Sequence, residues 1–350
     1  MSRTLARLSM LAVSALVPLA AACSGSDRPR TTSAGANTPT VTASSTAGET
    51  SGTAEVVAPV SFEVAESAFG AGRYPEATQL FTTYTAAHPE NPWGYYMLGM
   101  SAWKAGDHEK ASVAFDQALQ LDPSHRKSLF NSSRVLLETG NPKEALERIE
   151  KSLSLEPMSN EALRLLGRAR YELGNVEDAI KAYQRALAID ERDVWAMNNL
   201  GLIYIQQGRS CEALAPLARA VELRSNAPVF QNNLGTALER SGYPTAAAQA
   251  YEAAIAVDST YGKASVALAR VTSGEQKPES TPVDLVRLSQ QFQADIESWR
   301  GTAEVVDTSV TQVTTVSDSV AEPVEGVIDS AVVSGGKLSE PLEECAPEAE

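Results

Sequence analysis

The chain has 350 residues, 43% of them hydrophobic and 21% charged, and its 44 acidic and 29 basic side chains give a formal net charge of −15. Residues 301–350 hold eleven Asp or Glu and one Lys, so this segment alone supplies ten of the fifteen negative charges. Because nucleic acid is bound mainly through basic side chains, this charge balance argues against a nucleic-acid partner.

The N-terminus has the pattern of an export signal. Arg3 and Arg7 precede an apolar run from Leu8 to Ala22, and no acidic residue occurs before Asp27. The run is too short for a stable membrane-spanning helix and is typical of a secretory signal peptide. We therefore expect residues 1–22 to be a signal peptide and the protein to be exported.

The apolar run is followed directly by a cysteine, and the letters LAAAC end at Cys23. This ending resembles the lipobox of bacterial lipoproteins, in which the cysteine is acylated and becomes the mature N-terminus. The resemblance implies a lipid anchor at Cys23 that holds the protein on a bacterial membrane, in the periplasm or at the cell surface. Ala20-Ala21-Ala22 also fits ordinary signal cleavage, so a soluble secreted or periplasmic protein is the alternative.

A low-complexity segment follows the cysteine. Residues 24–57 are mostly Ser, Thr, Ala, Gly and Pro, with almost no side chain to bury. Such a composition cannot form a core and behaves as a flexible coil. We expect residues 23–57 to be a lipidated, disordered linker that keeps the next domain roughly 30 Å from the membrane.

A pattern with a period of 34 residues runs through residues 58–261. In each of six units a small residue is followed seven residues later by glycine, then five residues later by alanine, then four residues later by a large apolar residue. The small residues are Ala65, Gly99, Ser133, Gly167, Gly201 and Gly235. The glycines are Gly72, Gly106, Gly140, Gly174, Gly208 and Gly242, the alanines are Ala77, Ala111, Ala145, Ala179, Ala213 and Ala247, and the large residues are Phe81, Phe115, Ile149, Tyr183, Leu217 and Tyr251.

Local sequence signals predict two helices in each unit. Glycine can adopt the left-handed conformation that ends the first helix, and Asp107, Asn141 and Asn175 are good N-caps for the second. Apolar residues such as Ala111 and Phe115 then recur at helical spacing, which gives one buried stripe. The small residue and the alanine would together let the two helix backbones approach closely. Pro89, Pro123 and Pro157 end the first three units.

The period, the glycine column and the paired helices resemble the tetratricopeptide repeat. The six units are residues 58–91, 92–125, 126–159, 160–193, 194–227 and 228–261, and residues 261–272 resemble a capping helix, so the solenoid covers 58–272. The resemblance implies an all-α, right-handed superhelix whose concave groove is lined by the first helices. Grooves of this kind bind extended peptides or helices, so we expect a protein or peptide partner.

In this family the groove is lined by the second, fifth, sixth, ninth, twelfth and thirteenth places of each unit. Trp93 and Trp103 are the expected exposed anchors for a partner. The residues that the resemblance assigns to the groove are Phe62, Phe69, Trp93, Tyr96, Met100, Trp103, Phe130, Asn131, Arg134, Arg164, Arg168, Tyr171, Trp195, Asn198, Asn199, Asn232 and Asn233.

The polar groove positions allow two interpretations each. Asn131, Asn199 and Asn233 share the sixth place and resemble an asparagine ladder that binds a peptide backbone through side-chain amides. The alternative is that these amides bind neighbouring helices or water.

The arginines at groove positions are similarly ambiguous. Arg134, Arg164 and Arg168 together can clasp a carboxylate, because the guanidinium group offers paired donors. The alternative, which we favour, is that Arg134 pairs with Glu138 and Arg168 with Glu172 along the helix surface.

Known catalytic patterns are missing from the sequence. His88, His108 and His125 lack metal-ligand spacing, and there is no phosphate-binding loop, nucleophile elbow or Cys-x-x-Cys motif. We expect no enzymatic activity, no cofactor and no metal. Cys211 and Cys345 either pair in an oxidising compartment or remain isolated thiols.

A last amphipathic helix is predicted within residues 281–300. Leu285, Leu288, Phe292, Ile296 and Trp299 recur at helical spacing between a Thr-Pro start and Gly301. We expect residues 273–300 to comprise a linker and this helix, docked on the solenoid or in its groove. Residues 301–350 are expected to be a disordered acidic tail that competes for basic sites.

Together these features predict a membrane-tethered, exported scaffold that binds another protein in its groove during assembly or regulation of a cell-envelope complex. The architecture is similar to that of pilotin-type lipoproteins for type IV pilus secretins and of adaptor lipoproteins that bring proteases to substrates. A self-associating structural component of the envelope is the alternative.

Overall fold

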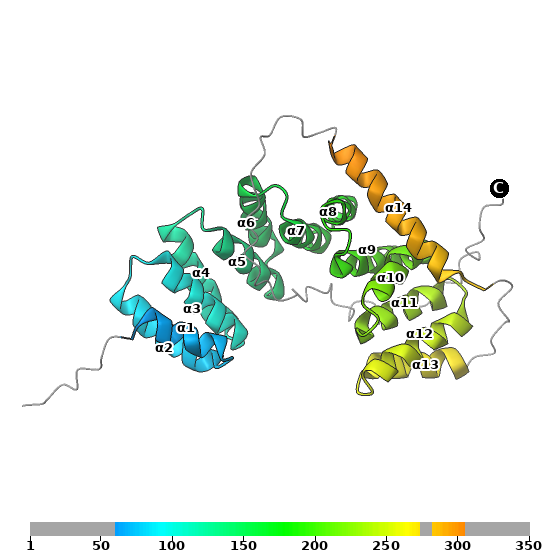
Figure 1. Ribbon diagram of the computed structural model, residues 1–350, viewed down its shortest axis with the longest axis horizontal. Helices are drawn as coiled ribbons and strands as arrows, with labels where there is room; N and C mark the ends of the chain where they lie inside the picture. The colour runs from blue at the N-terminus through cyan, green and yellow to red at the C-terminus, as the bar shows by residue number, and fades with distance from the viewer. Residues whose placement is uncertain (1–59, 274–281, 305–350) are drawn as a thin grey trace, which may run out of the picture. The chain divides into compact units, whose positions relative to one another are not determined.

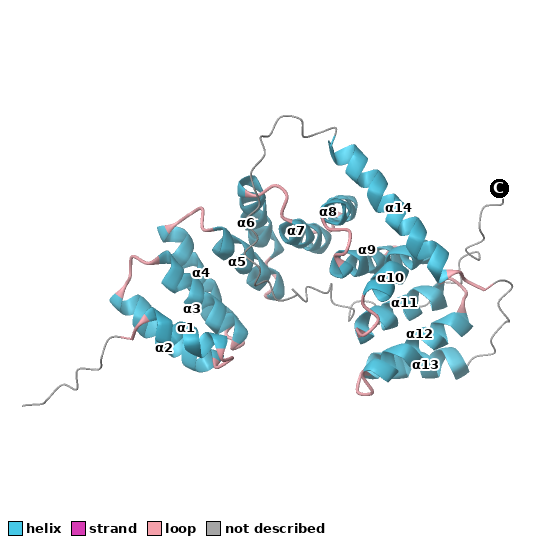
Figure 2. Cartoon of the chain, viewed as in Figure 1, coloured by secondary structure: helices cyan, strands magenta, loops and turns pink. Residues whose placement is uncertain are grey.

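The structure is a computed structural model that describes residues 60–273 and 282–304, with side chains described up to Arg300. Within these ranges the chain is helical and contains no strand, and short loops join consecutive helices (Figures 1 and 2). The helices are α1 (Phe62–Gly70), α2 (Tyr74–Ala87), α3 (Pro92–Lys104), α4 (His108–Leu121), α5 (Arg126–Glu138), α6 (Pro142–Leu155), α7 (Asn160–Glu172), α8 (Val176–Ile189), α9 (Val194–Gln206), α10 (Ser210–Leu223), α11 (Pro228–Arg240), α12 (Pro244–Val257), α13 (Gly262–Ser273) and α14 (Leu285–Glu304).

The first twelve helices form six antiparallel hairpins. In each hairpin the first helix packs on the second, and the second packs on the first helix of the next hairpin. Consecutive first helices also pack on one another at most junctions, whereas α14 packs on α8 and α10. We call the surface formed by α1, α3, α5, α7, α9 and α11 the first-helix face.

The turn inside each hairpin is made by the predicted glycine. All six glycines have a positive φ, between 73° and 85°, which a side chain would strain. After α3, the N–H of Gly106 donates to the carbonyl of Trp103 at 2.9 Å and the N–H of Asp107 donates to that of Ala102 at 2.8 Å. The glycine prediction is therefore confirmed at every turn.

The predicted N-caps differ in how they act. Asp107 accepts a hydrogen bond from the N–H of Lys110 at 3.0 Å, as an N-cap side chain should. Asn141 and Asn175 occupy the N-cap positions of α6 and α8, but neither side chain makes a capping hydrogen bond. The amide of Asn141 instead donates to the carbonyl of Thr139 at 3.3 Å.

Four of the six small residues are glycines that lie against the large side chain of the second helix. A Cβ built on Gly201 would lie 2.5 Å from Cγ of Leu217, and one on Gly167 would lie 2.7 Å from Cζ of Tyr183. In these four hairpins the absent Cβ thus makes room for the large side chain of the second helix. Close packing inside these four hairpins depends on this contact.

The C-terminal helix ends later than predicted and lies on one of the two surfaces that the sequence allowed. It continues past Gly301 to Glu304. It packs on α8 and α10, which are second helices, so the alternative of docking in the groove is wrong (Figure 1).

Several predictions fall on residues outside the described ranges. These are the signal peptide, the lipid anchor at Cys23, the linker up to residue 57 and, of the acidic tail predicted for residues 301–350, residues 305–350. Cys211, near the start of α10, is disulfide-bonded. Cys345, which the sequence allowed either as its partner or as an isolated thiol, lies outside the described ranges.

Candidate ligand-binding face

The residues assigned to the groove lie on the first helices, but their side chains differ greatly in accessibility. Trp93 is the most open of the predicted anchors, with 37% of its surface exposed. Met100, Trp103, Phe130, Arg134, Arg168 and Tyr171 are half-buried. Tyr96, Asn131, Arg164, Trp195, Asn198, Asn199, Asn232 and Asn233 are buried. Phe62 and Phe69 of α1 are half-buried as well, so the accessible set lies on α1, α3, α5 and α7.

Trp93 is held at the start of α3 by local capping. The side chain of Asn91 accepts hydrogen bonds from the N–H groups of Trp93 at 3.0 Å and Gly94 at 3.2 Å. Pro92 occupies the first helical turn, where its missing N–H costs nothing. The indole is thus fixed on a rigid helix start.

A cation and two further rings surround the Trp93 indole. Nζ of Lys127 lies 5.1 Å from its ring centre, within cation–π range. The Tyr96 and His125 rings lie 5.0 Å and 5.4 Å away. Burial raises the pKa of Tyr96 to about 12, and burial lowers the pKa of His125, so both rings are uncharged at neutral pH. We call Trp93 and Lys127 with these two rings the Trp93 cluster.

A second aromatic and cationic group joins α3 to α5. Cζ of Arg134 lies 4.2 Å from the ring centre of Trp103. The indole N–H of Trp103 donates to Glu138 at 2.7 Å, and Nε2 of His108 lies 3.3 Å from the same carboxylate oxygen. Trp103 is thus tied to its neighbours and is less available than Trp93.

The other two arginines are engaged with neighbouring groups. Nε of Arg168 donates to Glu172 at 2.7 Å, which is the helix-surface pair that the sequence favoured, and its Nη2 donates to the carbonyl of Leu137 at 3.2 Å. Arg164 is buried and lies 3.4 Å from Asp193, whose carboxylate also caps α9. A carboxylate clasp made of three arginines would have to replace these contacts.

The asparagines of α9 and α11 bind one another in a directional chain. Asn232 donates to Asn233 at 3.3 Å, Asn233 to Asn198 at 2.8 Å, Asn198 to Asn199 at 3.4 Å, and Asn199 to the hydroxyl of Tyr183 at 3.4 Å. Burial raises the pKa of Tyr183. We call these five side chains the asparagine chain. It agrees with the alternative in which the amides bind neighbouring helices.

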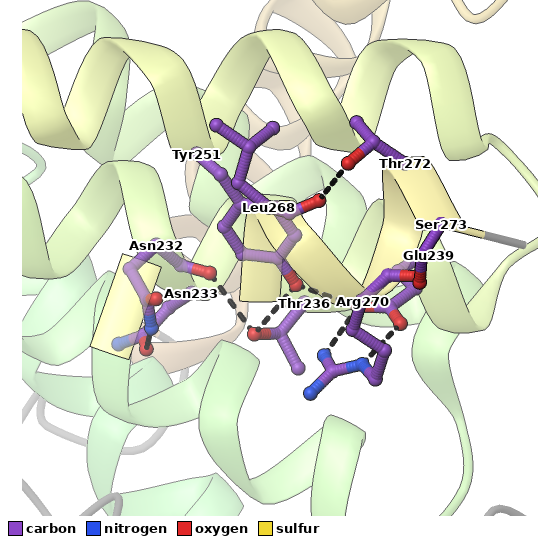
Figure 3. Close-up of polar contacts among 9 residues, drawn as sticks. All are labelled: Asn232, Asn233, Thr236, Glu239, Tyr251, Leu268, Arg270, Thr272 and Ser273. Carbon is purple, nitrogen blue, oxygen red and sulfur yellow. Dashed lines mark hydrogen bonds and ion pairs between the residues drawn. The ribbon is translucent and has the colours of Figure 1, made fainter. Parts of the chain in front are cut away.

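The C-terminal end of the first-helix face is closed by a compact polar group (Figure 3). Nε and Nη2 of Arg270 in α13 donate to the two oxygens of Glu239 at 2.8 Å and 2.7 Å. The hydroxyl of Tyr251 donates to Glu239 at 2.8 Å and lies 3.4 Å from the hydroxyl of Thr236. This bidentate ion pair attaches the capping helix to the last hairpin.

Sequence reasoning missed Lys127, Asp193 and the pair of Glu239 with Arg270. Lys127 stands at the second place of its unit, as Trp93 and Trp195 do, so the same register could have found it. Asp193 and Arg270 lie outside the groove positions of the family. Their roles become visible only in the structure, where Asp193 lies beside Arg164 and Arg270 beside Glu239.

Among the described residues, no group of three or more His, Cys, Asp or Glu side chains is placed to hold a metal ion. Also among them, no helix is long and apolar enough to cross a membrane.

Parts of the chain match models of known protein families. Models described as "Tetratricopeptide repeat" match residues 62–126 and 194–227, and one described as "TPR repeat" matches residues 167–208. The chain is a tetratricopeptide repeat protein. A model described as "Anaphase-promoting complex, cyclosome, subunit 3" also matches residues 104–186. No curated protein matches the chain.

Two solved structures that align with TM-scores above 0.5 share this fold. The tetratricopeptide repeat chain aligns with a tetratricopeptide repeat protein from Parabacteroides merdae at 16% identity and a TM-score of 0.51, covering 61% of this chain and 82% of the other. It aligns with a chain of the APC/C hetero-tetramer Cut9–Hcn1 at 20% identity and a TM-score of 0.53, covering 59% and 41%. MamA from Desulfovibrio magneticus RS-1 is similar at 24% identity and a TM-score of 0.45, covering 47% and 92%.

Proposed function

We propose that this tetratricopeptide repeat protein is an exported scaffold, anchored to a bacterial membrane through acylated Cys23, that binds a protein or peptide partner on its first-helix face. Its role is the assembly or regulation of a cell-envelope complex. The export and anchoring parts rest on the sequence of residues 1–23. The binding part rests on the fold and on the Trp93 cluster.

The accessible Trp93 cluster is the observation that carries the proposal. Binding energy at protein interfaces is concentrated in a few aromatic and cationic side chains that sit on rigid elements. Trp93 meets these conditions, because Asn91 fixes its helix start and Lys127 lies over its ring. A partner that covers the indole removes apolar area from water and gains a nearby positive charge.

The test is affinity capture from detergent-solubilised membranes with the full-length protein. The double variant Trp93→Ala, Lys127→Ala should lose a partner that the wild type retains, by about tenfold or more in captured amount, as expected for a hot spot. Val113→Ala is the matched control, because Val113 is an exposed apolar residue on the second helix α4. Equal capture by all three proteins would contradict binding at the Trp93 cluster.

The lipid anchor at Cys23 is tested separately in the same experiment. Cys23→Ser should move the protein from the membrane fraction to the soluble fraction, while capture of the partner by the soluble protein persists. A Cys23→Ser protein that still sediments with membranes would contradict the lipid anchor without affecting the binding proposal.

A self-associating envelope component is the second candidate. The observation that favours it is Val266 on the capping helix α13, which is largely exposed at the end of the stack. A mass that rises with concentration in the wild type but not in Val266→Asp would support this candidate.

A further inference from the structure

The helix α14 buries its apolar side chains between two second helices. Ile296 is 1% exposed, Phe292 is also buried, and the Trp299 ring packs edge-on against that of Phe292 at 5.7 Å. These side chains belong to the same core cluster as residues of α8, α9 and α10. The apolar stripe of α14 that the sequence predicts is therefore the face with which α14 packs on α8 and α10.

Polar contacts attach the two ends of α14 to different hairpins. Near its start, the hydroxyl of Ser289 donates to Glu222 in α10, which also pairs with Arg219 at 2.9 Å. Near its end, Nε of Arg300 donates to the carbonyl of Ala188 in α8 at 2.8 Å. The Arg300 guanidinium group also lies 3.0 Å from Glu191, just after α8. The helix thus bridges the fourth and fifth hairpins.

The bridged junction is the one where the repeats pack least closely. Each first helix packs on the next one from α1 to α7, and the same holds for α9, α11 and α13. Between α7 and α9 there is at most a weak contact. The packing of α8 on α9 is also the least extensive of the contacts between successive hairpins. The hydrogen bond from Asn199 to Tyr183 crosses this junction, so the asparagine chain depends on it.

We infer that the outer surface of α8 and α10 is a helix-binding surface and that α14 is its occupant, acting as an intramolecular clamp on the junction between the fourth and fifth hairpins. The surface takes an amphipathic helix with apolar side chains at the spacing of Phe292, Ile296 and Trp299 and an arginine at its C-terminal end. Docked α14 holds α8 and α10 at a fixed separation. This inference goes beyond the proposed function, because it requires no ligand on the first-helix face.

The test is hydrogen exchange, followed by mass spectrometry, on the full chain. Ile296→Asp places a charge in the apolar interface and should release α14. Amide exchange should then rise about tenfold or more in α14 and also in α8, α9 and α10, while α1 to α4 stay unchanged, because solenoid repeats unfold locally. Val286→Asp is the control: Val286 is 68% exposed on the same helix, and this variant should exchange like the wild type.

A synthetic peptide of residues 283–300 supplies the helix in trans. Added to the Ile296→Asp protein, it should restore slow exchange in α8 and α10, whereas the same peptide carrying Ile296→Asp should not. A helix that is released while α8 to α10 still exchange slowly would overturn the clamp. If the amides of α14 exchange as slowly as in the wild type even in the double variant Phe292→Asp, Ile296→Asp, then α14 is not held by these two side chains and the proposed docking is overturned. A doubled mass that disappears in Ile296→Asp would replace the intramolecular clamp by exchange of α14 between two copies.

Discussion

The residue type allowed at a position of a first helix depends mainly on the side chain that the second helix of the same hairpin packs against it. Gly201 and Leu217 illustrate this, because the space that a Cβ at residue 201 would need is filled by the leucine side chain. The turn glycines are constrained differently, by a positive φ and not by crowding. Glycines in two columns with the same spacing therefore serve two physical purposes.

Replacing Gly201 tests the crowding argument. Gly201→Ala should lower the free energy of unfolding by about 1–3 kcal/mol, because the added methyl overpacks the contact with Leu217. Gly262→Ala is the control, since Gly262 begins α13 and has no atom within 4 Å of a built Cβ. Urea denaturation measures both, and equal stability of the two variants would contradict the argument.

The asparagine chain makes a second prediction at this scale. Asn233→Ala should lower the free energy of unfolding by about 1–3 kcal/mol, because it leaves the buried Asn198 oxygen without its donor. Asn175→Ala should cost far less, since Asn175 is exposed and makes no capping hydrogen bond. Urea denaturation of both variants measures the difference, and a similar small loss for both would contradict a structural role for the chain. A binding test is accordingly better made at Trp93 than at these asparagines.

Whole helices are positioned by contacts that combine apolar burial with a few charged groups. The helix α14 shows both, with Ile296 in the interface and Glu222 beneath Ser289. The hydrogen bond from Ser289, and then the Arg219 guanidinium group, hold the pKa of Glu222 below its ordinary value. A carboxylate with a lowered folded-state pKa contributes stability above its unfolded pKa, and this contribution is lost as pH falls through the folded pKa.

The docking of α14 should therefore weaken on acidification. The thermal midpoint of the wild type should exceed that of Ser289→Ala at neutral pH, and the difference should shrink as pH falls through the acidic range in which Glu222 becomes protonated. The effect should be small, because 55% of the Glu222 side chain is exposed. Thermal unfolding followed by circular dichroism measures the difference, and a gap that does not vary with pH would contradict the role of Glu222.

At the scale of the whole molecule, stability is divided among the repeats. The buried apolar residues form separate clusters, one in α1 to α5, one in α5 to α7 and one that runs from α7 to α14. Each repeat of a solenoid contacts only its neighbours, so unfolding is expected to be local.

A core substitution in one cluster should therefore leave the distant one unchanged. Phe115→Ala removes a fully buried ring from the first cluster and should cost about 3–5 kcal/mol locally. Hydrogen exchange should rise in α1 to α4 and stay unchanged in α11 to α14, with Tyr251→Ala as the reciprocal control. A uniform rise along the whole chain would indicate one cooperative unit instead.

The amino-acid sequence by itself determined the repeat fold. A left-handed turn requires glycine and a buried stripe requires helical spacing, and both are local demands that recur every 34 residues, so the hairpins and the family could be predicted. The same register placed the candidate ligand residues on the first helices.

Only the tertiary structure decided which of those residues are accessible and where α14 lies. Asn198 and Trp93 both occupy groove positions, yet the first is bonded within a buried chain and the second is open, because burial depends on the side chains that neighbouring hairpins present. The stripe of α14 likewise predicts that the helix packs against something. Its partner surface on α8 and α10, however, exists only when two successive hairpins are stacked, and these hairpins lie far from α14 in the sequence.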